Sequence, residues 1–161
     1  MIFVLAAAMA MAAAAPSNCT SEASRQFDFW LGNWAVSNGR GEADGTARIE
    51  RTAGGCGILE YRIFRNGQTG TAINVFDPVR GRWSQLWSSP GTIVRLEGQW
   101  IGGQLATEGS IAAGGRETPL RVVWRPNADG SVTQTFTRRT PAPAEWQPMF
   151  VSTYRRFGGR S

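Results

Sequence analysis

The residues that could recognise a small molecule are polar side chains placed at alternate positions within short apolar stretches. Glu60, Asn74, Gln85 and Gln134 each share a strand face with large apolar or aromatic side chains, and Trp87 lies on the face of Gln85. Mostly apolar walls with a few polar groups are typical of small-ligand cavities. We therefore predict that these five residues bind a ligand. The alternative is that the amides face solvent or satisfy the backbone at bulges.

Glu60 is also the one candidate for acid–base chemistry. A carboxyl group buried among aromatic rings can have a raised pKa and act as a general acid or base, which would make the protein a hydrolase-type enzyme. However, no second carboxylate has a defined position beside it, and Arg62 lies on the same strand face. We favour a structural Glu60–Arg62 ion pair, so we assign no catalytic residue.

The composition excludes many other kinds of site. The sequence has no His, and each of its 17 basic residues is Arg. The lack of His removes Ser-His-Asp catalysis, His-ligated haem and most zinc or copper sites. The lack of Lys removes Schiff-base chemistry. We predict no metal and no cofactor.

The net charge of +5 does not indicate a nucleic-acid partner, although the isoelectric point is about 10.5. The arginines are scattered from Arg25 to Arg160 without a dense basic run. A solvated cationic surface explains this pattern better than a footprint for a phosphate backbone. The sequence gives no indication of the oligomeric state.

The N-terminal residues predict export. Residues 2–15 form an uncharged apolar run that ends in small residues, which is typical of a signal peptide over residues 1–15. The run is short for a membrane span, which needs about 20 residues, so we expect a periplasmic or secreted protein without stable membrane insertion; an uncleaved anchor is the alternative. Because an exported protein with two cysteines commonly pairs them, we predict a Cys19–Cys56 disulfide.

The rest of the chain reads as short strands separated by Gly, Pro, Asn and Asp. After a short helical turn near residues 21–26, strands are expected from Trp34 and over 45–51, 57–65, 71–77, 82–88, 92–99, 105–112, 119–125, 131–139 and 147–157. About ten short strands at this spacing, with no helix-period stretch between them, predict an all-β sandwich or closed barrel. We expect one antiparallel β-domain over residues 22–158.

The segment that leads from Phe27 through Gly32 to Trp34 resembles the Gly-x-Trp entry of calycin barrels, the lipocalins and their relatives. The order of motifs along the chain, from this segment to Tyr154-Arg155-Arg156, also resembles that of an uncharacterised exported bacterial family with lipocalin-like barrels. The resemblance implies that Trp34 closes one end of the barrel under a basic residue from the last strand. The two candidates are Arg155 and Arg156, and we choose Arg156 because it shares a strand face with Tyr154. The resemblance implies no particular activity.

Three functions follow as hypotheses. The first is an exported binding protein whose barrel holds a small, partly polar or aromatic molecule. The second is a structural or interaction module of the cell envelope with a filled barrel. The third is the hydrolase-type enzyme that uses Glu60. They differ in whether Glu60, Asn74, Gln85 and Gln134 converge on an open cavity.

Overall fold

The computed structural model describes residues 19–157, which form a closed antiparallel barrel preceded by a short helix. The elements are α1 (Glu22–Arg25), the 3-10 helix η1 (Asp28–Trp30), β1 (Gly32–Asn38), β2 (Ala43–Arg51), β3 (Gly57–Phe64), β4 (Thr69–Asp77), β5 (Arg82–Ser89), β6 (Thr92–Ile101), β7 (Gln104–Ala113), β8 (Arg116–Pro126), β9 (Val132–Arg139) and β10 (Trp146–Arg156). The predicted fold class, an all-β barrel of roughly ten antiparallel strands, is confirmed. The expected signal peptide lies outside the described residues.

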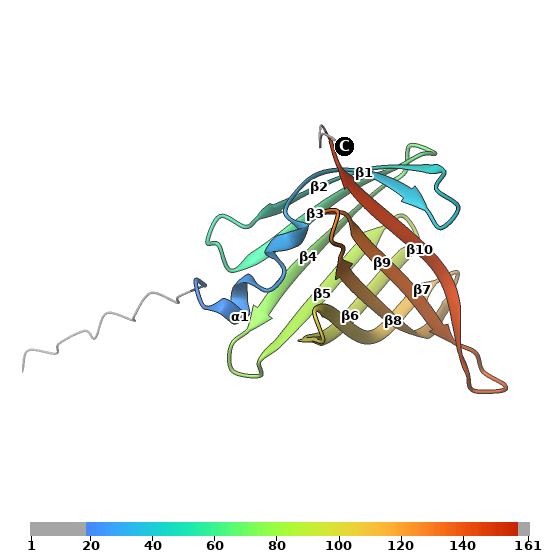
Figure 1. The fold of residues 1–161 in the computed structure, drawn as a ribbon. Helices are drawn as coiled ribbons and strands as arrows, with labels where there is room; N and C mark the ends of the chain where they lie inside the picture. Colours follow the sequence, from blue (N-terminus) through green and yellow to red (C-terminus); the bar gives the residue numbers. More distant parts are fainter. Residues whose placement is uncertain (1–18, 158–161) are drawn as a thin grey trace, which may run out of the picture.

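The barrel is an up-and-down meander in which each strand pairs with the next one along the chain. The last strand, β10, returns to β1 and closes the sheet from Trp34↔Arg156 to Asn38↔Ser152. In Figure 1 these two strands, one blue and one red, lie side by side. Closure removes both sheet edges, so every strand is paired on two sides. No helix within residues 19–157 has the length and apolar character needed to cross a membrane.

Strand alternation decides which side chains enter the barrel. On β3, Ile58, Glu60 and Arg62 are buried, whereas the next residue, Ile63, points outward and is 53% exposed. The same alternation buries Ala72 and Asn74 on β4. The strand faces expected from the sequence are therefore those of the structure. The first strand begins at Gly32, two residues earlier than Trp34, because the ladder with β2 starts at Gly32↔Ile49.

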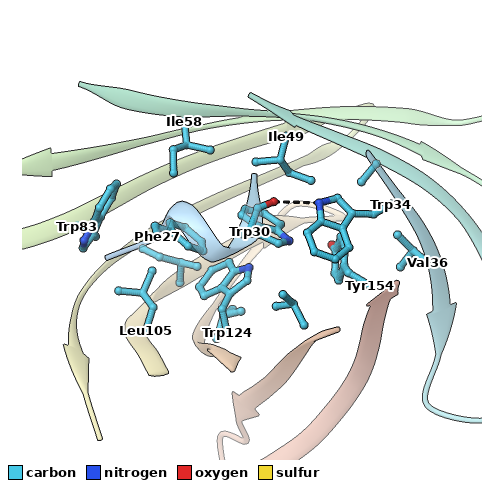
Figure 2. Packing of buried hydrophobic residues seen from close by; sticks show 14 of the residues in the cluster. Phe27, Trp30, Trp34, Val36, Ile49, Ile58, Trp83, Leu105, Trp124 and Tyr154 are labelled. Carbon is cyan, nitrogen blue, oxygen red and sulfur yellow. Dashed lines mark hydrogen bonds between the residues drawn. The ribbon is translucent and has the colours of Figure 1, made fainter. Parts of the chain in front are cut away.

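The segment before β1 fills one end of the barrel. Ser21 caps α1 by accepting a hydrogen bond from the Ser24 backbone N–H at 3.2 Å. The chain then turns inward through η1, and Phe27, Trp30 and Trp34 are fully buried. We call these three residues the plug. Figure 2 shows them between the two walls of the barrel, with the Trp34 indole donating to the Trp30 carbonyl oxygen at 2.9 Å.

Aromatic contacts hold the plug in place. The Phe27 ring stacks on Trp30, with centroids 4.9 Å apart. It also meets the edges of Trp83 at 5.6 Å and Trp124 at 5.5 Å. Each buried ring removes about 150–250 Å² from water, and favourable ring pairs add about 0.5–1.5 kcal/mol beyond that. The plug is therefore part of the hydrophobic core rather than a mobile lid.

Arg156 covers the outer side of the plug. Its guanidinium lies 4.4 Å from the centroid of the Trp34 ring and donates to the Leu31 carbonyl oxygen at 2.8 Å. Gly32 is needed beneath it, because a Cβ there would collide with this guanidinium and its φ of +135° is unfavourable for other residues. Arg155 instead faces Asp129 on the surface. The structure thus places Arg156, as expected, on Trp34.

Two cross-links attach the N-terminal segment to the barrel wall. The predicted Cys19–Cys56 disulfide is present and joins the chain before α1 to the turn before β3. Asp28 in η1 pairs with Arg25 at 2.6 Å and also contacts Arg51 at the end of β2. The plug is therefore fixed covalently and electrostatically at the end of the barrel where β2 finishes.

Candidate functional site

A pocket of about 620 Å³ occupies the part of the barrel that the plug leaves unfilled. The plug lies where β1 begins and β10 ends, and the pocket extends to the turns at the opposite end. Its lining comprises Asp44, Glu60, Arg62, Phe64, Arg65, Asn66, Gln68, Gln85, Trp87, Ser89, Pro90, Thr92, Val94, Ile111, Gln134, Phe136, Phe150, Ser152 and Tyr154. Exposed residues of the β3–β4 and β5–β6 turns, including Asn66 and Pro90, border its mouth.

Four of the five residues predicted to bind a ligand line this one pocket. Glu60 comes from β3, Gln85 and Trp87 from β5, and Gln134 from β9. Asn74 is not part of the lining: it is buried beside its cross-strand partner Gln85, whose Nε2 donates to Asn74 Oδ1 at 2.9 Å. Asn74 in turn donates to the Ile58 carbonyl oxygen at 3.4 Å. Its position therefore orients Gln85 rather than facing the pocket.

The polar centre of the pocket is a cross-barrel contact of Glu60, Gln134 and Tyr154. The Tyr154 hydroxyl lies 2.8 Å from Gln134 Oε1 and 3.3 Å from Glu60 Oε1. A phenol has a single proton, so it can donate to only one of these oxygens at a time. The shorter contact makes Gln134 the better acceptor. Glu60 then remains free to carry its own proton or to receive one from another donor.

Burial controls the ionisation of this centre. Glu60 is only 2% exposed. Loss of solvation raises the pKa of Glu60 to about 7, although the Arg62 charge and the Tyr154 hydrogen bond act in the opposite direction. Burial, followed by the Glu60 charge, also raises the pKa of Tyr154 well above its usual 10. The phenol therefore stays protonated, while Glu60 changes charge near neutral pH.

The predicted ion pair between Glu60 and Arg62 is wrong, because Arg62 has a different partner. Arg62 pairs instead with Asp44 on β2, at 2.8 Å, and its guanidinium also donates to the carbonyl oxygens of Asp44, Thr46 and Ile63 at 3.0–3.1 Å. Residues 60 and 62 point the same way but lie two positions apart along β3. The Arg62 guanidinium donates to acceptors on β2, and the alternation of side chains along β3 alone does not reveal them.

Aromatic rings form the wall nearer the mouth. Phe136 stacks on Phe150 with ring centroids 3.9 Å apart, and Phe64 meets the edge of Trp87 at 6.1 Å. The Trp87 ring packs directly on β4 because Gly70 has no side chain: a Cβ at that position would overlap the indole ring. The glycine thus decides where the Trp87 ring lies.

Sequence reasoning missed several pocket residues, of which Tyr154 is the most important. The sequence pattern places Tyr154 only on the strand face of Arg156 in the last strand. Its contacts with Glu60 and with the plug, where its ring meets Trp30 at 5.5 Å, depend on closure of β1 onto β10. The sequence did indicate that Phe64, Phe136 and Phe150 face the pocket. Each shares a strand face with a predicted polar residue or with Tyr154.

The chemistry available at this site is hydrogen bonding and proton exchange. Residues 19–157 contain no cluster of three or more Cys, His, Asp or Glu placed to hold a metal ion. No protein-family model and no curated protein matches this chain. The function must therefore be argued from the pocket itself.

Proposed function

We propose that this barrel binds a small, partly apolar molecule in the pocket between the plug and the β3–β4 and β5–β6 turns. The observation that carries the proposal is the convergence of Glu60, Gln134 and Tyr154 beneath aromatic walls in a space of about 620 Å³. This volume lies in the range of ligand pockets, roughly 300–1,000 Å³, and a few convergent polar groups on apolar walls provide orientation and specificity.

The energetic cost of Glu60 supports a functional reason for its position. A folded pKa of about 7 against the ordinary 4.5 makes the ionised form less favourable in the folded protein by about 3 kcal/mol. Groups that cost stability in this way cluster at sites that bind or react. A barrel built only as a filled structural module would be more stable with an apolar residue there. Ligand binding therefore explains Glu60 better than a purely structural role.

Acid–base catalysis is a weaker interpretation of the same pocket. A pKa near 7 suits proton transfer. The other carboxylate in the lining, Asp44, is paired with Arg62 and is not positioned as a second catalytic group. We therefore propose binding without turnover, and turnover of a bound compound would be the observation that favours the enzyme.

We also propose that the protein acts in the periplasm or outside the cell. The Cys19–Cys56 disulfide supports this proposal, because disulfides persist in oxidising compartments. The test is fractionation of cells that produce the full chain, with thiol labelling of each fraction. Protein found in the cytoplasm with free thiols would contradict the proposal.

The binding proposal is tested with a broad metabolite panel and thermal unfolding. A ligand that binds only the folded state raises Tm by mass action. We expect at least one compound to raise the Tm of the wild-type protein. The Gln134→Leu variant, which loses the pocket amide, should respond less, whereas Glu108→Gln on the outer surface should respond like wild type. A panel without any hit in thermal or calorimetric titration would contradict the proposed function.

A further inference from the structure

We call the part of the pocket formed by Glu60, Gln85, Gln134 and Tyr154 the floor. Its chemistry also indicates what kind of molecule would bind, and this inference rests on the proposed function. We infer that the ligand is an organic cation, such as a protonated amine on an apolar body, whose charged group binds Glu60. Three features support the inference: the acceptors at the floor, the absence of a cation bonded to Glu60, and the aromatic walls.

The floor offers mainly acceptors to a ligand. Glu60 has a second carboxylate oxygen with no hydrogen-bond partner among residues 19–157, and the Tyr154 proton is directed at Gln134. The Gln85 amide nitrogen donates to Asn74, and no hydrogen bond within residues 19–157 uses the Gln85 carbonyl oxygen. The Gln134 amide nitrogen, the second N–H of Gln85 and the Ser152 hydroxyl add donors, but all of them are neutral. A ligand group with several N–H donors satisfies this set better than an acceptor group does.

Glu60 also has no counter-ion of its own. None of the ion pairs formed within residues 19–157 includes it. The nearest basic side chain, Arg62, is engaged by Asp44 and three carbonyl oxygens, and Arg65 is exposed at the mouth. A carboxylate removed from water is stable only when it is paired or protonated. A cationic ligand would supply the missing charge.

The walls suit a cation as well as an apolar body. The rings of Phe64, Trp87, Phe136, Phe150 and Tyr154 all line the pocket. A cation over an aromatic face gains about 0.5–2 kcal/mol, most when it is desolvated. An organic acid would need a positive donor at the floor, and the buried guanidinium of Arg62 already has its acceptors. The geometry therefore favours an amine over a carboxylate.

Binding of such a ligand is expected to depend on pH. The charged groups around Glu60 among the described residues are Arg62 on its own strand, Asp44 on β2 and Arg65 at the mouth, and the neutral phenol of Tyr154 on β10 is the remaining titratable group. From β4, β5 and β9 come the neutral amides of Asn74, Gln85 and Gln134. With a Glu60 pKa of about 7, about nine-tenths of the carboxyl groups are ionised at pH 8 and about one-tenth at pH 6. Amine affinity should therefore fall about tenfold between these values.

The test uses matched probes in isothermal titration calorimetry. An amine, an alcohol and a carboxylate are compared on each of three bodies: indolyl, naphthyl and octyl. We expect at least one amine to bind wild-type protein at pH 8 at least tenfold more tightly than its matched alcohol. At pH 6, titrations in two buffers of different ionisation enthalpy should show release of nearly one proton per amine bound, because Glu60 must lose its proton.

Two variants separate the ion pair from the rest of the pocket. Glu60→Gln should abolish both the amine preference and the proton release. Glu108→Gln, whose carboxyl group lies on the outer surface beside Arg121, should behave as wild type. The proton count comes from the wild-type protein, so it remains decisive if Glu60→Gln does not fold.

The outcomes also separate this inference from the proposed function. Alcohols or carboxylates that bind as tightly as amines would overturn the cation inference and leave ligand binding intact. Amine binding without proton release at pH 6 would overturn it as well, since Glu60 would not be the partner. If neither these probes nor the metabolite panel bind, the proposed function fails and the inference fails with it.

Discussion

Glu60 links pocket chemistry to stability through its protonation. Its pKa is about 7 in the folded protein and near 4.5 when the chain is unfolded. Between pH 4.5 and pH 7 the Glu60 carboxyl group is mostly protonated in the folded state and mostly ionised in the unfolded state. Stability therefore decreases as pH rises through this window, by the linkage relation. The direction is opposite to that of an ordinary salt-bridged carboxylate, whose contribution is lost on acidification.

This linkage gives the first prediction. From pH 4.5 to pH 8 the free energy of unfolding of wild-type protein should fall by about 3 kcal/mol relative to Glu60→Gln, whose amide does not titrate. Urea titrations at several pH values measure the difference. Glu108→Gln provides the control and should run parallel to wild type. Parallel curves for wild type and Glu60→Gln would show that Glu60 does not have a raised pKa.

A second residue-scale prediction compares two neighbouring arginines. Arg156→Met removes the cation over Trp34 and the hydrogen bond to the Leu31 carbonyl oxygen, so we expect a loss of about 1–3 kcal/mol. Arg155→Met removes only an exposed pair with Asp129 and should change stability by less than about 0.5 kcal/mol. Chemical unfolding measures both. Equal losses would mean that the contact with Trp34 contributes nothing specific.

At the scale of the strands, Gly70 positions a pocket wall. The third prediction is that Gly70→Ala displaces the Trp87 ring, because the added Cβ would overlap it. The change should appear in the near-ultraviolet circular dichroism of the protein and lower the affinity of a bound probe about tenfold. Gly54→Ala is the matched control, since a Cβ there meets nothing within 4 Å. An unchanged spectrum for Gly70→Ala would contradict the assigned packing of Trp87.

The strands are the part of the structure that the sequence predicts well. Period-2 alternation on β3 indicated that Glu60 and Arg62 share a strand face, and Gly, Pro, Asn and Asp residues indicated the turns between strands. These signals are local, so they survive without knowledge of the rest of the fold. The same local reasoning failed for Arg62, whose partner Asp44 belongs to another strand.

Contacts across the barrel were beyond such reasoning. Tyr154 meets Glu60 only because β10 returns to β1 in one particular register. A shift by one residue would turn Tyr154 outward, since strand side chains alternate. The sequence therefore indicated which residues face inward, whereas the choice of partners depended on how the barrel closes. Asn74 illustrates the remaining limit: it is buried and hydrogen-bonded to Gln85, yet it is not part of the pocket lining.

For the whole molecule, the disulfide holds the N-terminal segment at the plug end. Cys19 and Cys56 are 37 residues apart, and closing a loop of this size restricts the unfolded chain by about 4 kcal/mol in the chain-entropy model. The fourth prediction is that Cys19→Ser/Cys56→Ser lowers the free energy of unfolding by about 3–4 kcal/mol. Unfolding of oxidised, reduced and double-variant protein in guanidinium chloride measures it. Identical midpoints for all three would contradict this role.

The meeting of β1 with β10 has a consequence for the order of events in folding. The plug belongs to the first part of the described chain, but Trp124 and Tyr154, which cover it, belong to the last. Contacts between such distant positions form slowly, because a long loop must close before any of them stabilises the chain. A chain that ends before β8 therefore lacks the part of the cover over Phe27, Trp30 and Trp34 that Trp124 and Tyr154 provide. These three aromatic residues lie near the start of the described chain and are among the last to be fully shielded from water.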